Sequence, residues 1–173
     1  MKEVYFKDYI YFQEGPGVRK YEYAQDGIPL MNIKLIKNNN ITLNDCKYVS
    51  KKLVDEKWKH FLINKDEILF SSSGSIGKKV IVRQEHLPLM LNTSIIRMKP
   101  IDSSKIKLKY LWYYLETEHF FTQVNKLKTG SSQFNFGPSH LNKMKLLLPS
   151  IEYQNNLINN LGRISKLKKL RLH

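Results

Sequence analysis

The spacing of apolar residues changes near residue 101 of this chain, and this change limits what the chain can fold into. Before it, short apolar runs alternate with stretches rich in Gly, Pro, Asn or Ser, a pattern typical of β-strands joined by turns. The runs lie at 4–12, 27–36, 66–70, 78–82 and 87–100. After it, Leu108, Leu111 and Leu115 recur at helical spacing, which predicts a helix over 102–130.

The rest of the chain adds one strand and a second helix. An apolar run ends at Pro149, and no proline interrupts the residues from Ser150 onward. The residues therefore predict an α+β fold: a twisted mixed β-sheet with packed helices over 1–149, then one long C-terminal helix of coiled-coil type over 150–173.

An apolar stripe on the C-terminal helix predicts a contact surface. Leu157, Leu161 and Ile164 share one face, with Ile158 at its edge, and Lys168 interrupts it. Such a stripe packs either on the helix's own domain or on a second copy of the chain. We take these four apolar residues as a candidate dimer interface.

Net charge and composition limit the classes of partner that the chain is expected to bind. The 173 residues carry a net charge of +14, and residues from His119 onward hold nine Lys or Arg against one acid, Glu152. This excess indicates a polyanion such as DNA, RNA or an acidic membrane surface. Cys46 is the single cysteine, and no long apolar run or signal peptide is present, so we expect a soluble, cytoplasmic protein.

The stretch 70–79, FSSSGSIGKK, is not a nucleotide-binding loop. A phosphate-binding P-loop needs Gly where Ser72 stands and a hydroxyl residue where Lys79 stands. The Gly74-x-x-Gly77 spacing also lacks the first glycine of a dinucleotide fingerprint, and a strand rather than a helix follows it. The stretch is predicted to be a turn between two strands.

Four small polar or basic loops are the candidate binding elements, and they lie at 17–21, 71–79, 92–94 and 128–135. Lys and Arg neutralise phosphates, while Arg, Asn and Gln also make paired hydrogen bonds to base edges. No histidine has metal-ligand spacing, and we expect no catalytic residue, no metal and no cofactor. The candidate nucleic-acid-binding residues are Arg19, Lys20, Tyr21, Ser71, Ser73, Ser75, Lys78, Lys79, Asn92, Thr93, Lys128, Thr129, Ser131, Ser132, Gln133 and Asn135.

The order of these motifs resembles a target recognition domain of the DNA specificity subunit of type I restriction–modification enzymes. The resemblance rests on DEILFSSSGSIGKKVIV, LMLNTSIIRMKP, YLWYYL and TGSSQFNF followed by MKLLLPSIEYQ, and it covers about residues 13–165. The chain departs from the family pattern at Phe136, Ser150 and Ile151. It also has the length of a half-subunit, with one domain and one helix.

The resemblance implies a non-catalytic role. Such a subunit reads double-stranded DNA and directs modification subunits, and through them the restriction subunit, to a split site. A homodimer through the C-terminal helix would restore the two-domain shape. It also implies that the shared 71–79 turn at most holds phosphates, so base readout is expected first from 17–23 and second from 128–135.

Three other functions stay open on sequence alone. The chain could mimic a specificity subunit and dock methyltransferase without reading DNA, or it could be a generic RNA-binding protein. It could also be a metal-dependent nuclease that uses Asp55 and Lys57. Competition between duplex DNA and single-stranded RNA, and incubation with plasmid and Mg²⁺, separate these functions.

Overall fold

A computed structural model describes residues 2–127 and 136–170 of the chain. Its centre is a four-stranded antiparallel sheet in the order β2 (Ile10–Glu14), β10 (Ile95–Pro100), β8 (Ile68–Ser71), β9 (Lys79–Ile81). The predicted hairpin around the 70–79 stretch is β8–β9. At its turn Gly77 has φ +103°, and a Cβ there would lie 2.9 Å from the Phe121 ring, so both conformation and space favour glycine.

Both faces of the central sheet are buried, which explains its continuous apolar runs. Side chains alternate between faces along a strand. Phe70 and Ile96 accordingly join one core with the helices, while Leu69 and Ile95 join a second core on the other side. A third core, with Trp58, lies under the small sheet described next.

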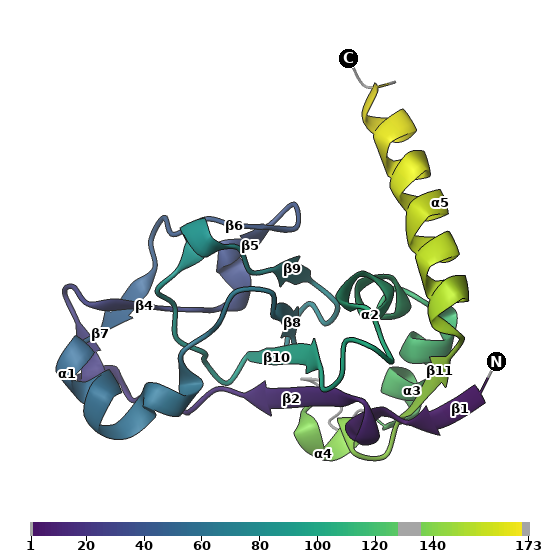
Figure 1. The fold of residues 1–173 in the computed structure, drawn as a ribbon. Helices are drawn as coiled ribbons and strands as arrows, with labels where there is room; N and C mark the ends of the chain where they lie inside the picture. The colour runs from purple at the N-terminus through teal and green to yellow at the C-terminus, as the bar shows by residue number, and fades with distance from the viewer. Residues whose placement is uncertain (1, 128–135, 171–173) are drawn as a thin grey trace.

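Three smaller sheets flank the central one. Strands β3 (Tyr23–Ala24), β7 (Lys47–Val49) and β4 (Ile28–Leu30) form one beside the three-residue helix α1 (Lys51–Leu53), and Figure 1 shows them at one end of the domain. A hairpin of β5 (Ile36–Lys37) and β6 (Asn40–Ile41) lies nearer the middle. At the opposite end β1 (Lys2–Tyr5) pairs with β11 (Lys145–Leu148).

The α+β prediction is confirmed, with several antiparallel sheets in place of one. The predicted 102–130 helix is two helices, α2 (Leu108–Tyr114) and α3 (Glu118–Leu127), and α4 (Pro138–Leu141) follows. The predicted strand over 87–100 contains regular strand only in β10.

The C-terminal helix α5 (Ile151–Leu170) runs away from the sheets in Figure 1. Its 20 residues span about 30 Å at the usual helical rise. Gln154, which is fully buried, joins the start of α5 to α2. Its side chain accepts a hydrogen bond from the Lys107 amide (2.8 Å) and donates to the Lys105 and Pro149 carbonyls.

Candidate nucleic-acid interface

Three of the four predicted loops meet at one edge of the central sheet. Because β10 is antiparallel to β2 and β8, its first residues lie beside the last residues of those two strands. The Ser72 amide donates to the Ser94 carbonyl (3.0 Å), and its hydroxyl donates to the Thr93 carbonyl (3.2 Å). Gly15 lies so close to the backbone of Leu91 and Asn92 that a Cβ there would clash. The loops after β2, after β8 and before β10 are therefore packed together.

A cleft opens where these loops meet. It has a volume of about 410 Å³ and is lined by Glu14, Ser72, Ser73, Thr93, Phe136, Gly137 and His140. Burial raises the pKa of the Glu14 carboxyl, and the hydrogen bond from the Ser72 hydroxyl partly opposes this rise. Sequence reasoning did not select Glu14 or His140. The position of Glu14 directly before Gly15-Pro16-Gly17 was the available signal for it.

The predicted base-reading segment 19–21 is on the surface. Arg19, Lys20 and Tyr21 are exposed, and Tyr21 is 84% exposed. Their backbone is held from one side by Glu22, whose carboxylate accepts from the Arg19 amide (2.6 Å) and from the Lys57 ammonium (2.9 Å). A fixed loop that presents an Arg, a Lys and a Tyr to solvent is suited to contact a polyanion.

The turn between β8 and β9 divides into buried and exposed residues. Ser75 and Lys78 are exposed, and Ser73 is half-buried, as is Asn92 in the neighbouring loop. Thr93, beside Asn92, is exposed. These residues keep the access to solvent that a phosphate contact needs.

The predicted set of DNA contacts is corrected at Ser71 and Lys79, because both side chains are buried. The Ser71 hydroxyl donates to the Ser75 carbonyl (2.6 Å) and closes the turn. The Lys79 ammonium pairs with Glu116 and lies 4.4 Å from the centre of the Trp112 ring. Both side chains are occupied inside the domain, and we do not propose them as DNA contacts.

The fourth loop falls outside the described residues. Its predicted contacts are Lys128, Thr129, Ser131, Ser132, Gln133 and Asn135. The next residue, Phe136, is described: its amide donates to the Ser72 carbonyl (3.1 Å), and its ring is buried in the main core. The chain therefore re-enters the described structure at the same edge of the sheet as the other loops.

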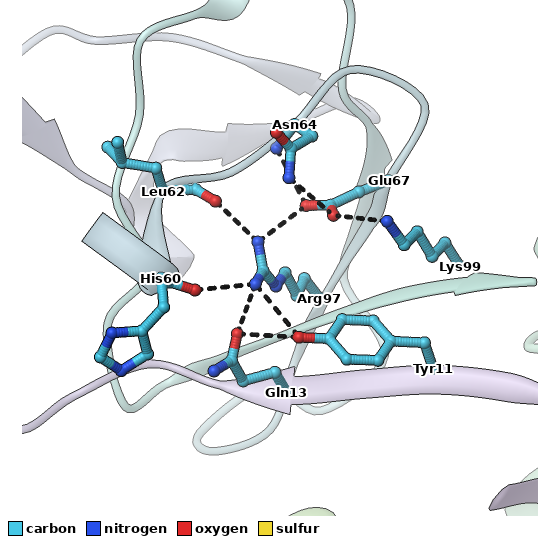
Figure 2. Close-up of polar contacts among 8 residues, drawn as sticks. All are labelled: Tyr11, Gln13, His60, Leu62, Asn64, Glu67, Arg97 and Lys99. Carbon is cyan, nitrogen blue, oxygen red and sulfur yellow. Dashed lines mark hydrogen bonds and ion pairs between the residues drawn. The ribbon is translucent and has the colours of Figure 1, made fainter. Parts of the chain in front are cut away.

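Arg97 and Glu67 belong to a buried charge network, and Arg97 lies on the same face of the sheet as Leu69 and Ile95. Figure 2 shows the polar contacts of this network. The Arg97 guanidinium donates to the His60 carbonyl (2.9 Å), the Leu62 carbonyl (2.6 Å) and the Gln13 side chain, and it pairs with Glu67 at 3.4 Å. Both charged residues are buried. The network ties segment 60–62 to β2 next to Glu14, the residue that borders the cleft.

The predicted dimer residues divide along α5. Leu157 and Ile158 are half-buried and pack against the domain's own main core. Leu161 is half-buried, and Ile164 is 49% exposed. Packing on the domain thus occupies the first turns of the stripe. The dimer interface remains a prediction, centred on Leu161 and Ile164.

Within residues 2–127 and 136–170, no three His, Cys, Asp or Glu side chains are grouped so that they could hold a metal ion. Lys57, one of the two nuclease candidates, binds Glu22, and Asp55 is exposed. The described part of the chain also contains no helix that is both long and apolar enough to cross a membrane.

Comparisons with known proteins agree on one family. The family described as "Type I restriction modification DNA specificity domain" matches residues 3–170. The specificity subunit of the type I restriction enzyme MjaVIII from Methanocaldococcus jannaschii is 23% identical over 171 residues, covering 97% of this chain and 40% of that protein.

Solved structures share the fold at low identity. The S subunit of a type I system from M. genitalium has a TM-score of 0.62 at 16% identity, covering 95% of this chain and 39% of that one. The HsdS subunit from Thermoanaerobacter tengcongensis has a TM-score of 0.69 at 15% identity, covering 96% and 37%. The chain thus spans about 40% of the length of the relatives that it matches. With a family match over almost its whole length, the chain belongs to the type I restriction–modification DNA specificity domain family.

Proposed function

We propose that this chain is a half-length specificity subunit that recognises double-stranded DNA by sequence and carries no catalytic activity of its own. The observation that carries the proposal is the family match over residues 3–170. The packed loops at one sheet edge, with Arg19, Lys20 and Tyr21 exposed nearby, support DNA as the polyanion that the +14 charge favours.

The proposal includes partners. The subunit docks modification subunits, which methylate DNA, and through them directs the restriction subunit to a split site. Two copies of the chain associate through α5, so that each contributes one recognition domain. Because a twofold dimer presents two identical readers, the DNA target is an interrupted palindrome whose spacer is set by the helices.

One experiment tests this function directly. The chain is expressed with its modification subunits in cells that lack other DNA methyltransferases, and the methylated bases are mapped across the genome. We expect one interrupted motif, methylated on both strands and with identical half-sites. An unmethylated genome, in cells where the purified complex is intact, would favour a mimic that docks methyltransferase without reading DNA.

A further inference from the structure

We propose that Lys37 and Lys78, which lie on two neighbouring hairpins, together hold one phosphate of the DNA backbone. This inference rests on the proposed DNA-binding function and deepens it, because it adds the β5–β6 hairpin to the interface. That hairpin contains none of the residues predicted from the sequence to contact DNA.

The two lysines line one pocket. It has a volume of about 390 Å³, and its lining consists of Ile36, Lys37, Asn38, Asn39 and Lys78. This volume is at the small end of the range for ligand pockets in proteins. The lining holds two ammonium groups and two carboxamides but no carboxylate, which is a donor-rich set suited to an anion.

Both lysines are free to bind an anion from outside. Their side chains are exposed, and no ion pair within the described residues involves either one. Lys79, next to Lys78, has the opposite character because it is buried and paired with Glu116. Of the two adjacent lysines, only Lys78 therefore presents its charge to solvent.

Hydrogen bonds and core packing fix the backbone from which each lysine side chain extends. Lys37 pairs with Asn40 across the hairpin, and Asn38 and Asn39 form a two-residue turn with φ of 51° and 58°. Ile36 and Ile41 anchor this hairpin in the second core. The Lys78 carbonyl accepts a hydrogen bond of 2.8 Å from the Ser71 amide, which fixes the backbone at Lys78. Both lysine side chains therefore extend from anchored backbone positions.

The pocket and the cleft are both lined by residues of the β8–β9 turn. The β8–β9 turn contributes Ser73 to the cleft at the sheet edge and Lys78 to this pocket. A DNA strand that crosses the turn could therefore place its bases near the exposed loops and one phosphate between the two hairpins. Lys78 lies in the 71–79 stretch, whereas Lys37 lies outside it, so the site joins two segments that are far apart in the sequence.

The test measures binding of the full chain to short duplexes of different sequence over a range of salt. The variants are Lys37→Gln, Lys78→Gln and the double substitution, and Lys2→Gln on β1 is the matched control for loss of one exposed charge. We expect both single variants to bind every duplex more weakly, by a similar factor for each sequence. We expect the double variant to lower the log–log salt slope by about 0.9, the value for one phosphate contact.

Two results would overturn the shared phosphate site. One is a Lys37→Gln variant that binds like the Lys2→Gln control. The other is a double variant whose slope falls by about 1.8, which means two separate phosphates. If the unsubstituted chain binds no duplex, alone or with its modification subunits, the proposed function fails instead.

Discussion

At the scale of single residues, Lys78 and Lys79 show how adjacent identical side chains take different roles. Desolvation by burial lowers the pKa of Lys79, and the Glu116 carboxylate only partly offsets this effect. Burying the charged form of Lys79 therefore costs free energy at neutral pH. The folded pKa lies below the unfolded one, so stability rises as pH increases through the interval between the two values.

The first prediction is that Lys79→Met keeps or raises the free energy of unfolding at pH 7. Methionine retains most of the stem that packs on Trp112, and Glu116 is exposed enough to be solvated when it loses its partner. Urea denaturation of both proteins at pH 7 and at higher pH measures their free energies of unfolding. The variant should lose part of the rise in stability with pH, and its affinity for DNA should not change. A variant that unfolds more readily at neutral pH would mean that the ion pair outweighs desolvation.

Arg19 and Gln133 are the residues for which base readout is predicted, and Arg19 is the one within the described residues. Its side chain is exposed beside a backbone held by Glu22, and arginine makes paired hydrogen bonds to guanine. We expect Arg19→Ala to reduce the binding preference for guanine at one position of the DNA site, by a free energy of about 1–3 kcal/mol. Affinity for duplexes substituted one position at a time measures the effect, with Lys20→Ala as control. A uniform loss over all sequences would make Arg19 a phosphate contact.

Arg97 is a buried charged residue on a sheet whose two faces are both buried. Removing it leaves Glu67 buried without its guanidinium partner and the carbonyls of His60 and Leu62 without a donor. Loss of one member of a buried pair usually costs about 3–5 kcal/mol. We expect Arg97→Leu to lower the free energy of unfolding by this amount, measured by urea denaturation. Arg97→Leu combined with Glu67→Leu should recover part of the loss, because no charge is then left buried. No recovery would assign the cost to the carbonyls alone.

At the scale of elements, the sequence predicted the parts whose local signals agree with their tertiary setting. The β8–β9 hairpin has an apolar strand on each side of a Ser- and Gly-rich turn, and both strands form as predicted. Helix α5 follows Pro149 as predicted. Exposed loops and their residue types could be predicted as well, since turn chemistry is local.

The helix predicted over 102–130 is interrupted at Thr117, whose side chain starts a new helix. The Thr117 hydroxyl accepts from the Phe120 amide (3.3 Å) and so caps the start of α3. The break lets Tyr114 and Phe120 pack edge to face, with ring centres 5.9 Å apart. Apolar spacing alone predicts one helix because the stripe continues across the break. The packing of Tyr114 on Phe120 favours the capped break over a continuous helix.

The segment 87–91 is apolar for a tertiary reason. Leu89 and Leu91 form backbone hydrogen bonds with Ile63 and Phe61, while the Met90 amide donates to Pro29. The segment thus lies between β4 and residues 61–63, and its backbone pairs with them through isolated bridges and not through a continuous ladder. The burial of Lys79 escaped prediction for a similar reason, because its partners Glu116 and Trp112 lie far away in the sequence.

Gln154 carries the junction between α5 and the domain. Its side chain makes three hydrogen bonds to backbone groups of Lys105, Lys107 and Pro149, and it is fully buried. We expect Gln154→Leu to lower the free energy of unfolding by about 2–3 kcal/mol, since it removes three hydrogen bonds at a partly buried junction. The exposed neighbour Asn155→Leu is the control, and both are measured by urea denaturation. Equal stability of the two variants would mean that water replaces the lost hydrogen bonds.

At the scale of the whole molecule, the open question is what covers the far end of α5. Leu157 and Ile158 already contact the domain's own core, which leaves Leu161 and Ile164 as the apolar residues farther along the stripe. Gly162 weakens this part of the helix by about 1 kcal/mol relative to alanine. The proposed seam is therefore short, and we expect a dimer of modest affinity that modification subunits strengthen.

Leu161→Asp tests the dimer because it places a charge on the seam beyond the turns that pack on the domain. We expect light scattering to show a dimer for the unsubstituted chain and a monomer for this variant, with unchanged circular dichroism, since Leu161 is absent from the core clusters. Asn159→Asp adds the same charge about 160° away around the helix and should leave the dimer intact. A chain that stays monomeric at tens of micromolar, with its modification subunits present, would contradict the twofold arrangement and its palindromic target. Mapping the methylated motif would then show whether a different half-subunit supplies the second recognition domain.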